Sequence, residues 1–152
     1  MSFVRWGKKV FFSVVSRGEG DFLVAFEYLE GPRYLSFLRE GGKALVSTYR
    51  IDLVPVKLGK MVYPSQRDDL FSSVETFLSV DTESLCRELG NSEVANTILL
   101  GVLSCFLPEI EDKLWKDVIR DMVKVAYQEL DQKAFEKGRK LGFMFLQREK
   151  EA

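Results

Sequence analysis

The sequence predicts an α/β fold with a mostly parallel sheet, and two apolar runs on either side of one helical segment carry that prediction. Phe22 to Phe26 is a continuous apolar run, typical of a strand that is buried on both faces. Ala44 to Ser47 is a second apolar run. Between them, Pro32 suits a first helical turn and the pair Gly41-Gly42 suits a helix end. Two strands joined by one helix are most simply parallel, with a right-handed crossover.

The chain before this unit predicts an antiparallel hairpin. Ser2 to Trp6 and Val10 to Val15 are mainly apolar, and a Gly7-Lys8-Lys9 turn separates them. Basic and aromatic residues interleave here, a pattern that also suits single-stranded nucleic acid. A formal net charge of −1 favours the strand interpretation and predicts no nucleic-acid partner.

After the unit the chain becomes irregular. Prolines and a glycine in residues 49–64 exclude a central strand and predict short edge pieces or extended loop, which we interpret as a plausible binding surface. A polar turn from Ser65 leads to a short helix near residues 68–71. Residues 74–80 then predict a further strand.

The last third of the chain predicts helices. Asp81 or Thr82 caps the first of them and Gly90 ends it. Residues 91–107 are apolar on most of their circumference, so we expect a buried helix in which Gly101 permits close approach of a neighbour.

The next predicted helix covers residues 110–126. In the final helix, Asp131 is expected to be the N-cap, between apolar residues placed as a hydrophobic staple. Gly138 and Gly142 are four residues apart, which again predicts close packing. Residues 147–152 are expected to form a frayed tail.

Length and composition predict one soluble domain over residues 1–152. A chain of 152 residues buries about 68–70% of its unfolded surface, enough for a core without a metal or a disulfide. Cys86 and Cys105 stand among apolar helical residues, so we expect two buried, reduced thiols and a cytoplasmic protein. No apolar run approaches the roughly 18 residues of a membrane span.

The motifs of catalysis are mostly missing, so we predict no catalytic and no metal-binding residues. The chain has no histidine, which excludes a histidine base and a Ser-His-Asp arrangement. No glycine-rich loop opens a helix after a strand. Glu27 and Glu30 follow the predicted central strand, with Arg33 one turn on, where α/β sheets bind ligands. The alternative for Glu30 and Arg33 is a surface ion pair at i, i+3.

Four segments in order resemble the gamma domain of the 2-oxoacid:ferredoxin oxidoreductases, and are most similar to the beta subunits of its indolepyruvate branch. The segments are residues 21–35, 56–64, 88–101 and 130–138. The resemblance implies a Rossmann-like sheet in three layers. The family's opening βα unit, with its Gly-x-Gly-Gly-Gln-Gly turn, precedes the point where this sequence starts. We therefore expect a partial domain with an uncovered sheet edge. Asp131 also stands where the family commonly has asparagine.

The resemblance implies an accessory subunit of a thiamine-diphosphate-dependent enzyme that is not catalytic on its own. In the family, thiamine diphosphate and the iron–sulfur clusters belong to other domains, here expected on a large partner subunit. Two cysteines cannot supply the four thiolates of a cluster. Glu27, Glu30, Arg33 and Asn96 are the candidates for an interface or crevice. The alternative is a stand-alone α/β interaction or ligand-binding module that forms homo-oligomers.

Overall fold

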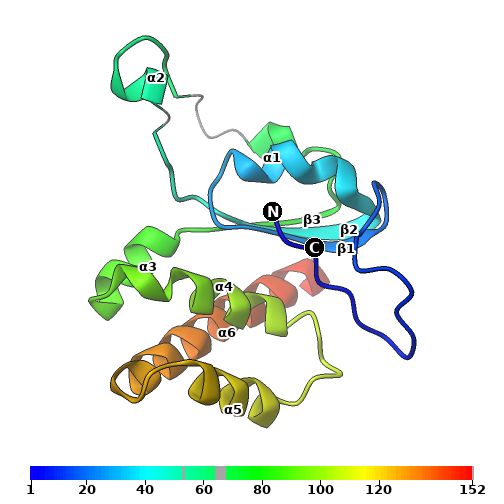
Figure 1. Ribbon diagram of the computed structural model, residues 1–152, viewed down its shortest axis with the longest axis vertical. Helices are drawn as coiled ribbons and strands as arrows, with labels where there is room; N and C mark the ends of the chain where they lie inside the picture. The colour runs from blue at the N-terminus through cyan, green and yellow to red at the C-terminus, as the bar shows by residue number, and fades with distance from the viewer. Residues whose placement is uncertain (53, 64–67, 152) are drawn as a thin grey trace. The chain divides into compact units, whose positions relative to one another are not determined.

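The computed structural model describes residues 1–52, 54–63 and 68–151, which form two compact units. Unit 1 contains residues 1–46 and 50–78, and unit 2 contains residues 47–49 and 79–152. The elements are β1 (Gly20–Ala25), α1 (Glu30–Tyr34), η1 (Leu35–Phe37), β2 (Leu38–Ser47), α2 (Val54–Lys57), η2 (Asp68–Phe71), β3 (Thr76–Val80), α3 (Thr82–Leu89), η3 (Ser92–Val94), α4 (Ala95–Ser104), α5 (Asp112–Met122), η4 (Val125–Tyr127) and α6 (Gln128–Glu151). Figure 1 shows them along the chain.

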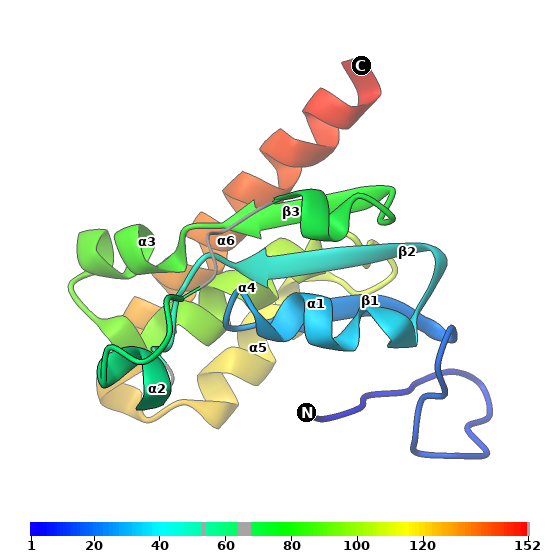
Figure 2. The same cartoon turned by 90° about the horizontal axis from the view of Figure 1, so that it is seen from above.

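The predicted α/β class and the parallel sheet are confirmed. Three strands lie in the order β1-β2-β3, and β1 pairs with β2 in parallel. In Figure 2 the arrows of β2 and β3 point the same way. Helix α1 and the short η1 connect β1 to β2, so the predicted strand–helix–strand unit is present.

The predicted end of this helix at Gly41-Gly42 is wrong. The helical segment ends at Phe37, and β2 begins at Leu38. The pair bulges the strand, because Gly20 pairs with Leu38 but Phe22 pairs with Lys43. Gly41 has φ +67°, a left-handed conformation that suits glycine.

The predicted N-terminal hairpin is also wrong, because residues 1–19 form no strand. Val4, Trp6, Phe11 and Phe12 are exposed, so the apolar runs have no face to cover. Two strands without a third are marginal in water. The segment is instead held by an ion pair between Arg5 and Glu19 at 2.8 Å and by contact between the rings of Phe3 and Phe37.

The core of unit 1 lies where α1 and η2 cover the sheet. Ala25, Ala44 and Val46 from the strands pack with Tyr28 and Phe71. The Phe71 ring meets that of Tyr28 edge to face, with 5.8 Å between centroids. The predicted short helix at 68–71 and the strand after it are thereby confirmed.

Helix α3 in unit 2 is capped at both ends as the sequence predicts. The Asp81 carboxylate accepts a hydrogen bond from Ser84 N at 3.0 Å, so Asp81 is the N-cap. This bond lowers the pKa of Asp81. Gly90, in the left-handed conformation, ends the helix. Thr82 is buried, and its hydroxyl bonds that of Ser47 at 2.7 Å.

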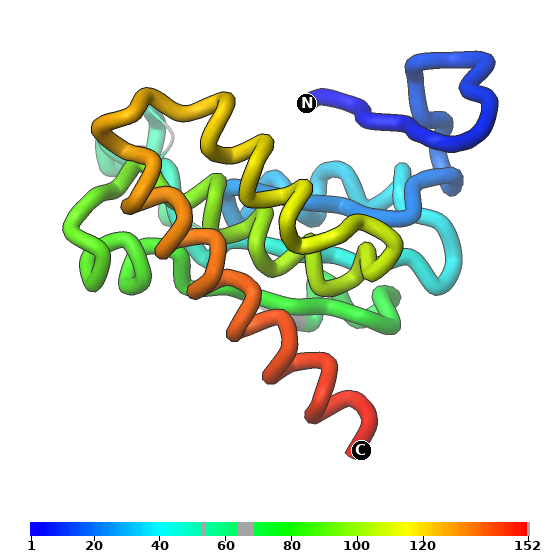
Figure 3. Tube along the Cα trace, turned by 90° about the horizontal axis from the view of Figure 1, so that it is seen from below, coloured from blue at the N-terminus to red at the C-terminus, as the bar shows by residue number. Residues whose placement is uncertain are grey.

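Helices α4 and α6 form the closest contact in unit 2, and three glycines make it possible. A Cβ atom at Gly101 would lie 2.2 Å from Phe135 O, and one at Gly138 would lie 2.0 Å from Ile98 O. At Gly142 the nearest atom, at 2.7 Å, would be Sγ of Cys105. The predictions of close packing at these glycines are therefore confirmed. Figure 3 shows the chain turning back from α5 into α6.

The predicted N-cap role of Asp131 is wrong. Helix α6 begins three residues earlier, at Gln128, so Asp131 lies within its first turn. Its buried carboxylate accepts a hydrogen bond from Thr97 Oγ1 at 2.5 Å, which ties α6 to α4. A strong side-chain partner on another helix has overridden the local capping pattern.

Helix α6 continues to Glu151, so the described part of the predicted tail is helical, and its fraying stays a prediction. Ala152 lies outside the described residues. None of the helices that the structure describes combines the length and apolar character needed to cross a membrane.

Candidate functional site

Glu27 is the candidate that the structure places in a built environment. It follows the carboxyl end of β1 and precedes α1, in the connection where parallel sheets carry their polar site residues. Its side chain is buried, with 8% of the residue exposed. A carboxylate at this depth requires partners, because an unpaired buried charge is costly.

Those partners come from three segments of unit 1. Oε2 accepts from Glu30 N at 3.0 Å, at the start of α1. Oε1 accepts from Ile51 N at 3.3 Å and from the hydroxyl of Tyr63. We call Glu27, Ile51 and Tyr63 the Glu27 latch. The latch joins the end of β1 to both ends of the segment that carries α2.

Tyr63 is held as a hydrogen-bond donor. Burial raises the pKa of its phenol, and the hydrogen bond to Glu27 and the negative charge of Glu27 raise this pKa further. The Arg50 guanidinium lies over the Tyr63 ring, 4.1 Å from the centroid, and bonds Asp52 at 2.5 Å. The arrangement can hold a loop in place.

The other predicted candidates stand on the surface. Arg33 and Glu30 form an exposed ion pair at 2.5 Å with i, i+3 spacing, as the alternative interpretation states. Asn96 is exposed in the first turn of α4 and belongs to unit 2. The structure therefore links Glu27 to Glu30 through the backbone amide of Glu30, and Glu30 to Arg33 through their side chains.

Sequence reasoning missed Tyr63 and Ile51 as partners of Glu27. Tyr63 is 36 residues away, and no periodic pattern links the two. The interpretation of residues 49–64 as edge pieces or extended loop is wrong in part, since residues 54–57 form a turn of helix. Pro64 and the predicted turn from Ser65 lie outside the described residues.

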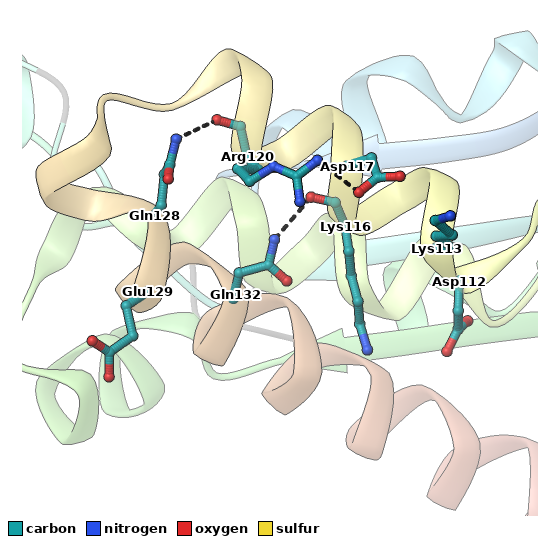
Figure 4. A pocket seen from close by; sticks show the side chains of 8 residues that line it. All are labelled: Asp112, Lys113, Lys116, Asp117, Arg120, Gln128, Glu129 and Gln132. Carbon is teal, nitrogen blue, oxygen red and sulfur yellow. Dashed lines mark hydrogen bonds and ion pairs between the residues drawn. The ribbon is translucent and has the colours of Figure 1, made fainter.

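An open groove of about 660 Å³ runs between α5 and α6 in unit 2. It is lined by side chains of both charges (Figure 4). Two glutamines of α6 tie the helices together across it: Gln132 Nε2 donates to Lys116 O at 2.8 Å, and Gln128 Nε2 donates to Arg120 O at 2.7 Å. We therefore interpret the groove as a helix–helix seam rather than a ligand site.

The thiols do not fit an iron–sulfur cluster. Cys86 and Cys105 are both buried and free, and burial raises the pKa of each. A cluster takes four thiolates, and the chain has two cysteines. Across the part of the chain that the structure describes, no group of three His, Cys, Asp or Glu side chains is placed to hold a metal ion.

Comparison with known proteins gives consistent results. The sequence model of the family described as pyruvate ferredoxin/flavodoxin oxidoreductase matches residues 1–141. Indolepyruvate oxidoreductase subunit IorB of Thermococcus kodakarensis is 33% identical over 145 residues, which cover 91% of this chain and 71% of that protein. The subunit of the same name from Pyrococcus horikoshii is 32% identical, with the same coverage.

A solved structure supports the fold. The crystal structure of a keto/oxoacid ferredoxin oxidoreductase gamma subunit from Geobacter sulfurreducens matches with a TM-score of 0.61 and 20% identity. The match covers 86% of this chain and 69% of that one. The resemblance predicted from four motifs is confirmed, and the chain belongs to the pyruvate ferredoxin/flavodoxin oxidoreductase family.

Proposed function

We propose that this chain is the accessory beta subunit of an indolepyruvate ferredoxin oxidoreductase and packs against a large catalytic subunit. The observation that carries the proposal is the 33% identity to subunit IorB over 91% of the chain. A likeness over 91% of the chain reaches both compact units, so it concerns most of the chain rather than one motif.

The chemistry of the chain supports an accessory role. It has no histidine, and its two cysteines are buried. The Glu27 carboxylate is engaged by three donors, so it is a poor candidate for a general base. The resemblance implies that thiamine diphosphate and the iron–sulfur clusters reside on the large subunit, where the 2-oxoacid is decarboxylated.

Within this proposal, Glu27 acts through the segments that it holds. Glu30, Arg33 and Asn96 are exposed and are the proposed contacts with the large subunit. Since all three are polar, we expect them at the rim of an interface rather than at its apolar centre.

The test is to co-express this chain with the large subunit from the same genome and to separate the products by size exclusion. We expect a stable complex whose indolepyruvate-dependent dye reduction requires this chain. The large subunit expressed alone is the control, and it should lose most of this activity.

Elution of the chain apart from the large subunit, as a homo-oligomer, would overturn the proposal. It would favour the second candidate, a self-associating interaction module. The exposed apolar side chains of α5, Leu114, Val118 and Met122, are the observation that supports this alternative.

A further inference from the structure

We propose that residues 54–63, which we call the α2 loop, are a docking loop that inserts into an apolar, carboxylate-bearing surface of the large subunit. This inference rests on the proposed function and names the part of the chain that makes the contact. The loop has hydrogen bonds within its own backbone, yet most of its apolar side chains are exposed.

The backbone of the α2 loop closes on itself. Leu58 N donates to Val54 O at 3.0 Å, and Lys60 N donates to Pro55 O at 2.8 Å. Gly59, with φ +68°, takes the left-handed turn that this closure needs. The Glu27 latch then fixes the loop at its last residue, Tyr63, and at Ile51 just before it. The loop therefore has a defined shape without a partner.

The apolar side chains contribute almost nothing to that order. Leu58 is 63% exposed, Met61 is 56% exposed and Val62 is 89% exposed. Figures 1 and 2 show α2 standing apart from the strands and α1 of its own unit. Ordinary compact loops are packed by their own side chains. Here polar contacts hold the loop and leave its apolar side chains free to be buried by another molecule.

Charge identifies the kind of surface that fits. The loop contains Lys57 and Lys60 and no carboxylate, whereas the whole chain has a net charge of −1. Its occupant should therefore present carboxylates around an apolar recess. Because the loop is already shaped, docking loses little conformational entropy, which favours affinity.

Helix α5 provides a matched comparison. Val118 and Met122 are also exposed, but Asp117 and Asp121 stand beside them. Substitutions there remove a similar apolar area from a helix whose three carboxylates are balanced by three basic side chains. They control for a general loss of surface hydrophobicity.

The experiment measures the affinity of purified variants for the tagged large subunit. We expect Leu58→Ser with Met61→Ser to weaken binding by at least about tenfold, as truncation of central apolar contacts does. Lys57→Glu with Lys60→Glu should weaken it by about tenfold and reduce its dependence on salt. Val118→Ser with Met122→Ser should stay within about twofold of the wild type. Circular dichroism and melting temperature confirm that each variant is folded.

Tyr63→Phe tests the latch separately, because it removes one hydroxyl and leaves the exposed apolar side chains of the loop unchanged. We expect weaker binding, with faster amide exchange confined to the loop. Faster amide exchange in the loop together with weaker binding would show that Tyr63 positions the loop rather than contacting the large subunit directly.

The outcomes separate the two proposals. If the wild type binds the large subunit and the loop variants bind equally well, the docking inference is wrong and the accessory role stands. If the wild type does not bind, both are wrong. Loop variants that disrupt only a homodimer would overturn the choice of partner.

Discussion

In the α4–α6 pair, order comes from two helix backbones that touch through glycines, whereas in the α2 loop it comes from one buried carboxylate and a few backbone hydrogen bonds. The first region excludes water and leaves no room for a methyl group. The second leaves its apolar side chains in solvent. Close packing suits a fixed scaffold, and a polar latch suits a surface that must be presented to another molecule.

The largest effect is expected at the α4–α6 contact. Gly138→Ala would place a methyl group 2.0 Å from Ile98 O, so the helices must separate. We expect a loss of about 3 kcal/mol or more in the free energy of unfolding, measured with urea. Gly142→Ala should cost less, because the nearest atom there belongs to the Cys105 side chain. A gain of about 1 kcal/mol at Gly138, as for an open helical glycine, would contradict the close contact.

Substitutions in the Glu27 latch should lower the free energy of unfolding less than Gly138→Ala does. Glu27→Ala leaves the Tyr63 hydroxyl and the Ile51 amide without their acceptor. We expect a loss of about 2 kcal/mol in the free energy of unfolding and faster proteolysis within the α2 loop. Glu27→Gln keeps an acceptor oxygen and should fall between the alanine variant and the wild type. Unchanged proteolysis in Glu27→Ala would show that the loop is ordered without the latch.

The Asp81 carboxylate, which caps α3, allows a comparison with the buried Glu27 carboxylate of the latch. Asp81→Ala removes the acceptor for Ser84 N and should cost about 1 kcal/mol at pH 7. Because the folded state lowers the pKa of Asp81, the stabilisation is present above its ordinary value of 3.8 and is lost as the pH falls through the folded pKa. The difference between variant and wild type should therefore shrink below pH 4. A constant difference down to pH 2 would mean that the charge of Asp81 contributes nothing.

The smallest effect is expected at the exposed pair of Glu30 and Arg33. Arg33→Ala should change the free energy of unfolding by less than about 0.5 kcal/mol, because both side chains are solvated. The same variant, assayed for binding to the large subunit, tests whether Arg33 is an interface residue. A stability loss above 1 kcal/mol would show that the pair has a structural role.

The sequence predicted best where one short pattern determined the outcome. The existence of β1, the Asp81 cap and the Gly101 contact all follow from local rules. The predicted burial of the first strand on both faces is wrong, because β1 is mostly half-buried and Phe26, which follows it, is exposed. The predictions failed where a distant partner decided. Asp131 bonds Thr97 on another helix, and Glu27 bonds Tyr63 from 36 residues away. Neither pair follows from the periodicity of a helix or a strand, so the sequence pattern does not indicate that these residues are in contact.

The prediction that Gly41-Gly42 ends a helix failed for a related reason. A pair of glycines suits both a helix end and a bulged strand, because each uses a left-handed residue. The choice depended on whether residues 38–40 pair with β1, which is a property of the sheet and not of the pair itself.

The contact between Gly101 and Gly138 also restricts how this chain can drift in evolution. A side chain that enters at either position meets the backbone of the opposite helix, so no single compensating substitution nearby restores the fit. Relatives that keep this helix pair should therefore keep both glycines together. In the proposed docking role, the exposed Leu58, Met61 and Val62 of the α2 loop have no such restriction and can change one residue at a time.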